Sequence, residues 1–163
     1  MPEIDFWLRG QPVGKQRPRF ANGRVYTPHK TKQYEMRIAA AASDVMVDKG
    51  YNPTTEPVAI HIKAQFEIPK SWPKWKREAA TRREIHPQKP DIDNIAKTIL
   101  DGLNGVAFED DQQVVHMICE KRYGDPLVIV KVRWRDNETT NNKIEGSAQV
   151  HHNADQSNQR PRD

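Results

Sequence analysis

The chain has 163 residues, a net charge of +4 at pH 7 and a single cysteine, Cys119. That length suffices for one domain with a buried core, and a lone cysteine excludes an internal disulfide and a thiolate metal site. No apolar run approaches the length of a membrane span, and residues 1–10 lack the basic start and apolar run of a signal peptide. We therefore expect a soluble cytoplasmic protein.

The first half of the chain mixes strand and helix patterns. Residues 3–10 alternate apolar and polar side chains, which predicts a strand. Asn22-Gly23 lies between short β-prone runs and predicts a tight hairpin. Residues 29–50 change to helical spacing, and residues 57–69 return to the alternation of a half-buried strand.

The second half adds two helices and closes in strands. Residues 71–84 predict a short basic helix with Ser71 as its N-cap. Residues 93–103 carry an apolar stripe at helical spacing, and residues 103–134 predict two or three strands separated by turns. This order favours an α+β fold in which a small mixed sheet is packed with helices.

The composition changes at Asp136. Residues 136–163 are polar with almost no large apolar side chains, which predicts a disordered tail after a folded domain of residues 1–135. The tail takes three of the 26 Lys and Arg residues and five of the 22 Asp and Glu residues, so the domain holds 23 bases and 17 acids, a net +6. A basic surface around a local acidic centre suits a polyanionic partner held near a metal, but ordinary solubilising charge explains the composition equally well.

Carboxylates gather around one predicted helix, in the segment KPDIDNIAKTILDGLNGVAFEDDQQ of residues 89–113. Pro90 disfavours a helix before Asp91, so we expect Asp91 in extended chain and Asp93 at the N-cap of the helix. Both carboxylates can then face one point near the positive end of the helix dipole. Lys97 lies one turn beyond Asp93 on the same helix face.

Asp110 and Asp111 stand at the start of the following strand. If they converge with the helix carboxylates, the four acids form a hard oxygen-ligand site for Mg²⁺ or Mn²⁺. The sequence leaves open whether that strand starts near the beginning of the helix or near its far end. Without a metal, an N-cap, an ion pair between Asp93 and Lys97, and a solvated turn would explain the same residues. An EF-hand and a sugar-nucleotide site both fit poorly.

The segment KPDIDNIAKTILDGLNGVAFEDDQQVV closely resembles the signature of the RusA-type Holliday-junction resolvases of bacteria and their phages. GQPVGKQRPRF, VYTPHKTKQYE and SWPKWKREAA resemble the phage-like branch, so the resemblance covers about residues 8–135. It implies a RusA-like homodimer that resolves four-way DNA junctions by paired symmetric nicks during recombination and repair. The implied cofactor is Mg²⁺, with Mn²⁺ as a substitute, and no nucleotide cofactor is expected.

The resemblance also assigns roles by position. The implied catalytic residues are Asp91, Asp93, Lys97 and Asp111, and the implied metal ligands are Asp91, Asp93 and Asp111, with Asp110 in a secondary role. Bases that could hold phosphates are Lys15, Arg17, Arg19 and Arg24 on the hairpin, Lys74, Lys76, Arg77, Arg82 and Arg83 on the basic helix, and Lys89. Pro90 stands where some members have a basic residue, which weakens any specific role for Lys89. The alternatives are a non-catalytic junction-binding or duplex-binding protein and a less selective nuclease of branched DNA.

Overall fold

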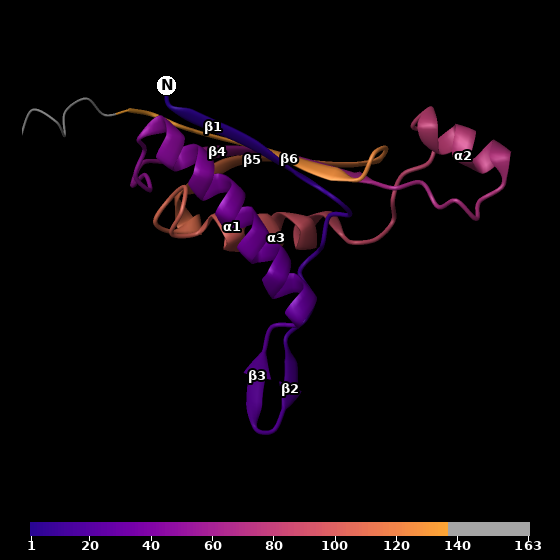
Figure 1. Ribbon diagram of the computed structural model, residues 1–163, viewed down its shortest axis with the longest axis horizontal. Helices are drawn as coiled ribbons and strands as arrows, with labels where there is room; N and C mark the ends of the chain where they lie inside the picture. Colours follow the sequence, from indigo (N-terminus) through magenta and orange to yellow (C-terminus); the bar gives the residue numbers. More distant parts are fainter. Residues whose placement is uncertain (137–163) are drawn as a thin grey trace, which may run out of the picture.

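The computed structural model describes residues 1–136 and shows a mixed β-sheet with helices on one face (Figure 1). The elements in chain order are β1 (Glu3–Arg9), β2 (Arg19–Ala21), β3 (Arg24–Tyr26), α1 (His29–Lys49), β4 (Val58–Phe66), α2 (Lys74–Thr81), α3 (Ile92–Leu103), the 3₁₀ helix η1 (Asp111–Gln113), β5 (Val114–Tyr123) and β6 (Leu127–Trp134). The predicted α+β fold and its two closing strands are confirmed. The tail predicted for residues 136–163 lies, apart from Asp136, outside the described residues.

Four strands form the main sheet in the order β1-β6-β4-β5. β6 runs antiparallel to both β1 and β4, whereas β4 and β5 are parallel. Ile62 at the centre of β4 lies opposite Val130 of β6 and Cys119 of β5. β1 and β5 are therefore the two edges of the main sheet.

The core lies between the sheet and the helices α1 and α3. The alternation of β4 buries Val58, Ile60 and Ile62 on the helix face and leaves His61 on the other. Helix α1 presents a stripe at four-residue spacing, Tyr34, Ile38, Ala42 and Met46, and α3 presents Ile95, Ile99 and Leu103. The spacing of these side chains makes each helix amphipathic, and burial of the apolar stripe holds it on the sheet.

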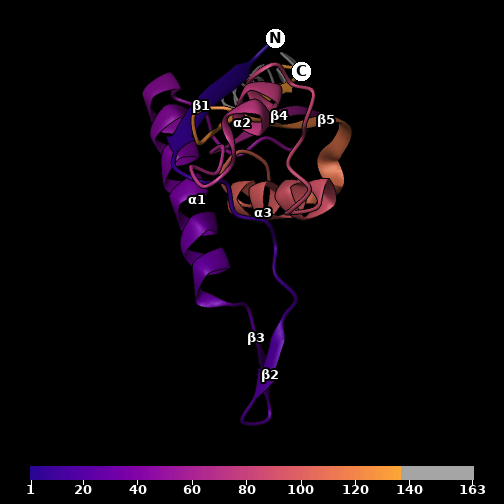
Figure 2. The ribbon, with the colours of Figure 1, turned by 90° about the vertical axis from the view of Figure 1, so that its right-hand side faces the viewer.

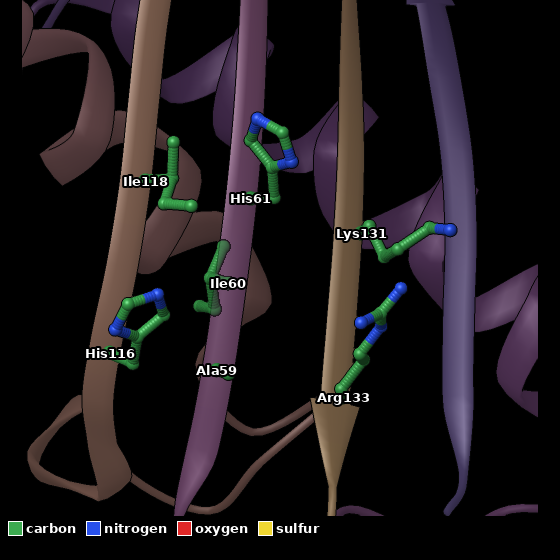
Figure 3. A pocket seen from close by; sticks show the side chains of 7 residues that line it. All are labelled: Ala59, Ile60, His61, His116, Ile118, Lys131 and Arg133. Carbon is green, nitrogen blue, oxygen red and sulfur yellow. The ribbon is translucent and has the colours of Figure 1, made fainter.

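The opposite face of the sheet, which we call the open face, carries polar and basic side chains such as His61, Lys131 and Arg133 (Figure 3). The β2–β3 hairpin and α2 project away from the sheet in different directions (Figures 1 and 2). Within residues 1–136, no helix has both the length and the apolar composition that a membrane crossing requires.

Candidate active site

The first functional feature is the start of α3. The helix begins at Ile92, and Asp91 occupies the N-cap position in extended backbone, with φ of −63° and ψ of 146°. The expectation that Asp93 caps the helix is wrong, because Asp93 lies inside the first turn. Proline disfavours helical backbone only for the residue before it, so a helix can start directly after Asp91. The Asp91 side chain makes no capping hydrogen bond, which leaves its carboxylate free to face outward.

Two lysines surround Asp91. The Nζ of Lys89 lies 2.7 Å from Asp91 Oδ1. The hydrogen bond from Lys89, its positive charge and, to a smaller extent, the charge of Lys121 hold the pKa of Asp91 below its ordinary value. Lys121 Nζ itself donates to the carbonyl oxygens of Gln88 at 3.0 Å and Pro90 at 3.1 Å. Lys121 thus fastens the segment before Asp91 to the end of β5.

Lys121 was not singled out from the sequence. Its neighbours on alternate positions, Cys119 and Tyr123, are apolar, so alternation places Lys121 on the helix face of β5, where a lysine needs partners. This alternation could have singled out Lys121 from the sequence. A lysine on the covered face of a strand, beside the acidic start of a helix, is expected to be held by hydrogen bonds to neighbouring groups.

Asp93 and Lys97 lie on the exposed side of α3. Lys97 Nζ is 3.8 Å from Asp93 Oδ2, and the two side chains are 62% and 65% exposed, so the predicted i,i+4 pair is present and open to solvent. An exposed pair of this kind contributes at most about 1 kcal/mol to folding. Both groups remain available to a ligand at the positive end of the helix dipole.

Asp110 and Asp111 take different roles at the start of β5. Asp110 caps η1: its side chain accepts a hydrogen bond from the Gln112 amide at 2.9 Å, and its own amide donates to Gln113 Oε1 at 2.9 Å. The Gln113 side chain is in turn anchored on the carbonyl oxygens of Thr54 and Glu56. Asp111 is exposed and follows directly, on a segment held rigidly by these bonds.

The two pairs of acids lie at opposite ends of α3. η1 and the loop before it are bonded to the end of α3, where the Gly105 amide donates to the carbonyl of Phe108, and to the Thr54 backbone. Asp91 lies at the start of the same helix. Among residues 1–136, no group of three or more His, Cys, Asp or Glu side chains is arranged to hold a metal ion. The sequence left open at which end of the helix the following strand starts. Within one chain, β5 starts at the far end of α3.

A profile of the family described as endodeoxyribonuclease RusA matches residues 9–133. The chain belongs to the RusA family. It is also 36% identical over 138 residues to YqaN of Bacillus subtilis (strain 168), a protein described as uncharacterized, covering 80% of this chain and 95% of that relative. Family membership supports the general reaction, hydrolysis of phosphodiester bonds within a DNA strand, and DNA as the partner.

In this RusA-family chain, the predicted phosphate contact Lys15 is held by carboxylates. Lys15 Nζ lies 2.6 Å from Glu35 and 2.7 Å from Asp101, and the Lys15 amide donates to the Asn94 carbonyl of α3 at 2.8 Å. Burial lowers the pKa of Lys15, but its bonds to Asp101 and Glu35 outweigh burial and raise the pKa above the ordinary value. Lys15 therefore docks the N-terminal loop on α3. Its contact with DNA stays a prediction.

The same loop packs against the segment before Asp91. A Cβ added at Gly14 would lie 2.5 Å from Pro90 Cβ and 2.9 Å from Pro90 Cγ, closer than side chains can approach. Glycine is thus required where the loop crosses Pro90. The loop, the Pro90 segment and α3 form one packed unit around Asp91.

The basic hairpin, residues 17–27, projects from this unit (Figure 2). Asn22 and Gly23 both have positive φ, 51° and 73°, which suits a two-residue turn, so the predicted hairpin is confirmed. Residues 6–34 contain seven Lys and Arg residues and no acid. Arg19 and Arg24 lie on β2 and β3, and Arg17 precedes them. The hairpin thereby presents unneutralised positive charge away from the core.

Helix α2 carries the second basic group. It begins at Lys74 with Pro73 at the N-cap position, so Ser71 is not the cap that its side chain predicted. Trp72 packs edge-to-face on Tyr123, with ring centroids 5.4 Å apart, and Lys76 Nζ lies over the Trp72 ring, 4.0 Å from its centroid. Trp75 is 66% exposed. The structure places Lys74, Lys76 and Arg77 on this projecting helix, and their role in binding DNA stays a prediction.

Proposed function

We propose that this RusA-family chain is a structure-selective DNA endonuclease that depends on Mg²⁺ or Mn²⁺. It would resolve four-way junctions by paired symmetric nicks, in recombination and repair, and act as a homodimer. The observation that carries the proposal is the start of α3 in a RusA-family chain, where Asp91 and Asp93 are exposed beside Lys97. Asp91 makes no capping hydrogen bond, and the carboxylates of Asp91 and Asp93 are both exposed, so their oxygens are accessible to a cation at the positive end of the helix dipole.

The chemistry of the donors fits a hard divalent cation. The oxygens of Asp91 and Asp93 are the ligand type that Mg²⁺ and Mn²⁺ prefer, and a bound ion would supply an activated water and stabilise the charge that develops on the phosphate. Lys97, on the same exposed side of α3, could place its ammonium on a phosphate oxygen of the bound DNA. Lys89 can turn from Asp91 to the DNA backbone in the same way.

DNA binding is assigned to the two projecting basic groups. Arg17, Arg19 and Arg24 on the hairpin reach away from the core, and Lys74, Lys76 and Arg77 do so on α2. Phosphate contacts of this kind position the duplex without reading its sequence. Two arms pointing in different directions suit a branched substrate, whose arms also diverge.

The test is a cleavage assay on a synthetic four-way junction beside linear duplex and a flap, in Mg²⁺, in Mn²⁺ and in chelator. Paired nicks confined to the junction and lost in chelator would establish the proposal. Junction binding without cleavage in either metal would make the protein a binder. Equal cleavage of the flap would make it a less selective nuclease of branched DNA.

A further inference from the structure

Two tryptophans of the projecting segment around α2, residues 69–86, differ in their surroundings. We call this segment the α2 arm. Trp72 is partly buried: it packs edge-to-face on Tyr123 of β5, and the ammonium of Lys76 lies over its ring. Trp75 is 66% exposed, and in the part of the chain that the structure describes it takes part in no ring–ring or cation–ring contact. Trp72 therefore anchors the arm, and the ring of Trp75 faces solvent.

Positive charge surrounds the exposed ring. The α2 arm contains six Lys and Arg residues and two Glu residues, a net +4. Lys74 and Arg77, which flank Trp75 in sequence, are both exposed. Lys74 lies 3.8 Å from Glu78, an exposed i,i+4 pair that is too weak to prevent a contact with phosphate. Basic side chains around an exposed aromatic ring are the combination that binds unpaired nucleic acid, because the bases hold phosphates and the ring stacks on a nucleobase.

β5 places the root of the arm beside the segment that leads into α3. Tyr123 packs on Trp72, and Lys121 bonds the carbonyl oxygen of Pro90, next to Asp91. These two β5 residues lie on the same face of the strand, about 7 Å apart at ~3.3 Å per residue. Figure 1 shows the arm beyond the sheet, on the side where the chain enters α3. One DNA strand can therefore contact both the arm and the start of α3.

The presentation of Trp75 suits an unpaired base. Trp75 lies in the first turn of α2, where the Pro73 carbonyl accepts hydrogen bonds from the amides of Lys76 at 3.0 Å and Arg77 at 3.1 Å. The backbone under the ring is thus fixed. In a continuous duplex, each base face is covered by the next base pair, and opening a step costs a few kcal/mol. At a branch point the stack is already interrupted, so a base face is available to the indole.

We propose that the α2 arm binds an unpaired nucleobase at a DNA branch point. The base stacks on the ring of Trp75, while Lys74 and Arg77 hold the phosphates on its two sides. This inference rests on the proposed function and names the feature of branched DNA that α2 recognises. Phosphate contacts alone position a duplex and carry no information on its bases, whereas stacking requires a base that has left its stack.

The test measures binding in chelator, so that it needs no cleavage. The probes are a short duplex with one extrahelical thymine, the same duplex with an extrahelical abasic site, and the fully paired duplex. Wild-type protein should bind the thymine duplex about 10-fold more tightly than the other two, the effect of one stacked base. Trp75→Ala should bind all three alike. Trp75→Phe keeps an aromatic face and should keep most of the preference.

Trp7→Ala is the matched control. Trp7 is 58% exposed like Trp75, but it lies on the open face of β1 with the Arg9 guanidinium 5.3 Å from its ring centroid. Trp7→Ala should keep the full preference for the thymine duplex. A preference that survives in Trp75→Ala, or that is absent from wild-type protein, would overturn the proposal. Loss of the preference in Trp7→Ala as well would also overturn it, because the effect would not be specific to the arm.

Tryptophan fluorescence reports the stacked ring itself. A base on the indole of Trp75 should quench part of the emission when the thymine duplex binds, and the abasic duplex should quench less. The quenching should remain in Trp7→Phe and disappear in Trp75→Phe, although Trp75→Phe still binds. Quenching that remains in Trp75→Phe would place the base on another tryptophan and refute the site. A change in the molecular mass of the free protein in Trp75→Ala, with the thymine preference intact, would refute it too, because the ring would then pack on another protein chain.

Failure of the proposed function gives a different result. If wild-type protein shows the thymine preference and Trp75→Ala does not, yet wild-type protein cuts no junction in Mg²⁺ or Mn²⁺, the nuclease is refuted and the base site is supported. If wild-type protein cuts junctions and Trp75→Ala binds all three probes as wild-type protein does, only the base site is refuted.

Discussion

At the residue scale, Lys121 decides how Asp91 is presented. Its ammonium bonds two carbonyl oxygens of the segment that leads into α3, and it adds positive charge near the carboxylate. A residue held in this way acts through the backbone and not by touching a substrate. Residues that orient metal ligands typically change metal affinity when they are removed.

Lys121→Met should therefore weaken Mn²⁺ binding by about 10-fold, in the lower part of the range for residues that orient ligands. The metal concentration for half-maximal cleavage should rise, and cleavage at saturating metal should largely recover. Mn²⁺ is titrated into the protein, and the amount of bound Mn²⁺ and the cleavage rate are measured at each concentration. Lys63→Met on the open face is the control and should leave both curves in place. A change in DNA affinity without a change in metal affinity would contradict the positioning role.

Asp93→Asn should lower the cleavage rate by at least about 100-fold, while affinity for the junction stays the same or increases. Removing a carboxylate removes a metal ligand and also a source of repulsion for phosphates. Gel-shift and cleavage assays on the same junction separate the two effects. Loss of binding together with a lower thermal midpoint would indicate misfolding.

At the element scale, the sequence predicted most of the secondary structure because local periodicity determined it. The stripe of α1, the alternation of β4 and the Asn22-Gly23 turn each depend on neighbours in the chain. The predicted caps Ser71 and Asp93 are wrong. Proline and backbone packing determine where each helix begins, and the presence of a good capping side chain does not.

The hairpin is an element without a core of its own. Phe20 and Val25 pair across its two strands, and they are 74% and 70% exposed. An isolated two-stranded hairpin is only marginally stable in water. An exposed aromatic ring such as Phe20 would be able to stack on the face of a DNA base that is unstacked at a branch point.

Phe20→Ala should lower affinity for a four-way junction by about 10-fold, because a stacked base contributes about 1–3 kcal/mol. Affinity for linear duplex should change little, since its bases are already stacked. Phe20→Trp should restore junction binding. Fluorescence anisotropy measures the affinity for each substrate and so the ratio of junction affinity to duplex affinity. The fluorescence of 2-aminopurine at the branch reports unstacking of the base. An equal loss on junction and duplex would indicate a general effect on the hairpin.

Arg17→Ala tests the electrostatic part of the same element. It should weaken binding to every DNA sequence and lower the slope of log affinity against log salt by about 1. The control is Arg133→Ala, because Arg133 is already paired with Glu3 at 2.9 Å, and the slope should then stay unchanged. An unchanged slope for Arg17→Ala would exclude a phosphate contact there.

At the scale of the whole molecule, the candidate site could be predicted in part only. The residues of the site follow from a local motif. Their failure to converge within one chain follows from sheet topology, because β5 runs parallel to β4 and so begins beside the end of α3. That direction depends on contacts between residues far apart in sequence. Local patterns do not report such contacts.

Deleting residues 137–163 should leave the fold intact, because the core closes at Trp134 and the family match ends at residue 133. The thermal midpoint of residues 1–136 should equal that of the full chain. A lower midpoint, or loss of the cooperative transition, would show that the last segment contributes to stability.

The close packing of Gly14 against Pro90 makes the hairpin and the Asp91 segment mechanically continuous. Lys15, the residue after Gly14, bonds to α3 through its backbone amide and its side chain. The root of the hairpin is therefore fixed to the start of the helix. The hairpin is then the long arm of a lever whose short arm carries Asp91. In the proposed nuclease, a substrate that bends the hairpin would apply torque to the segment that carries Asp91, and the shape of the DNA would become a mechanical input to cleavage.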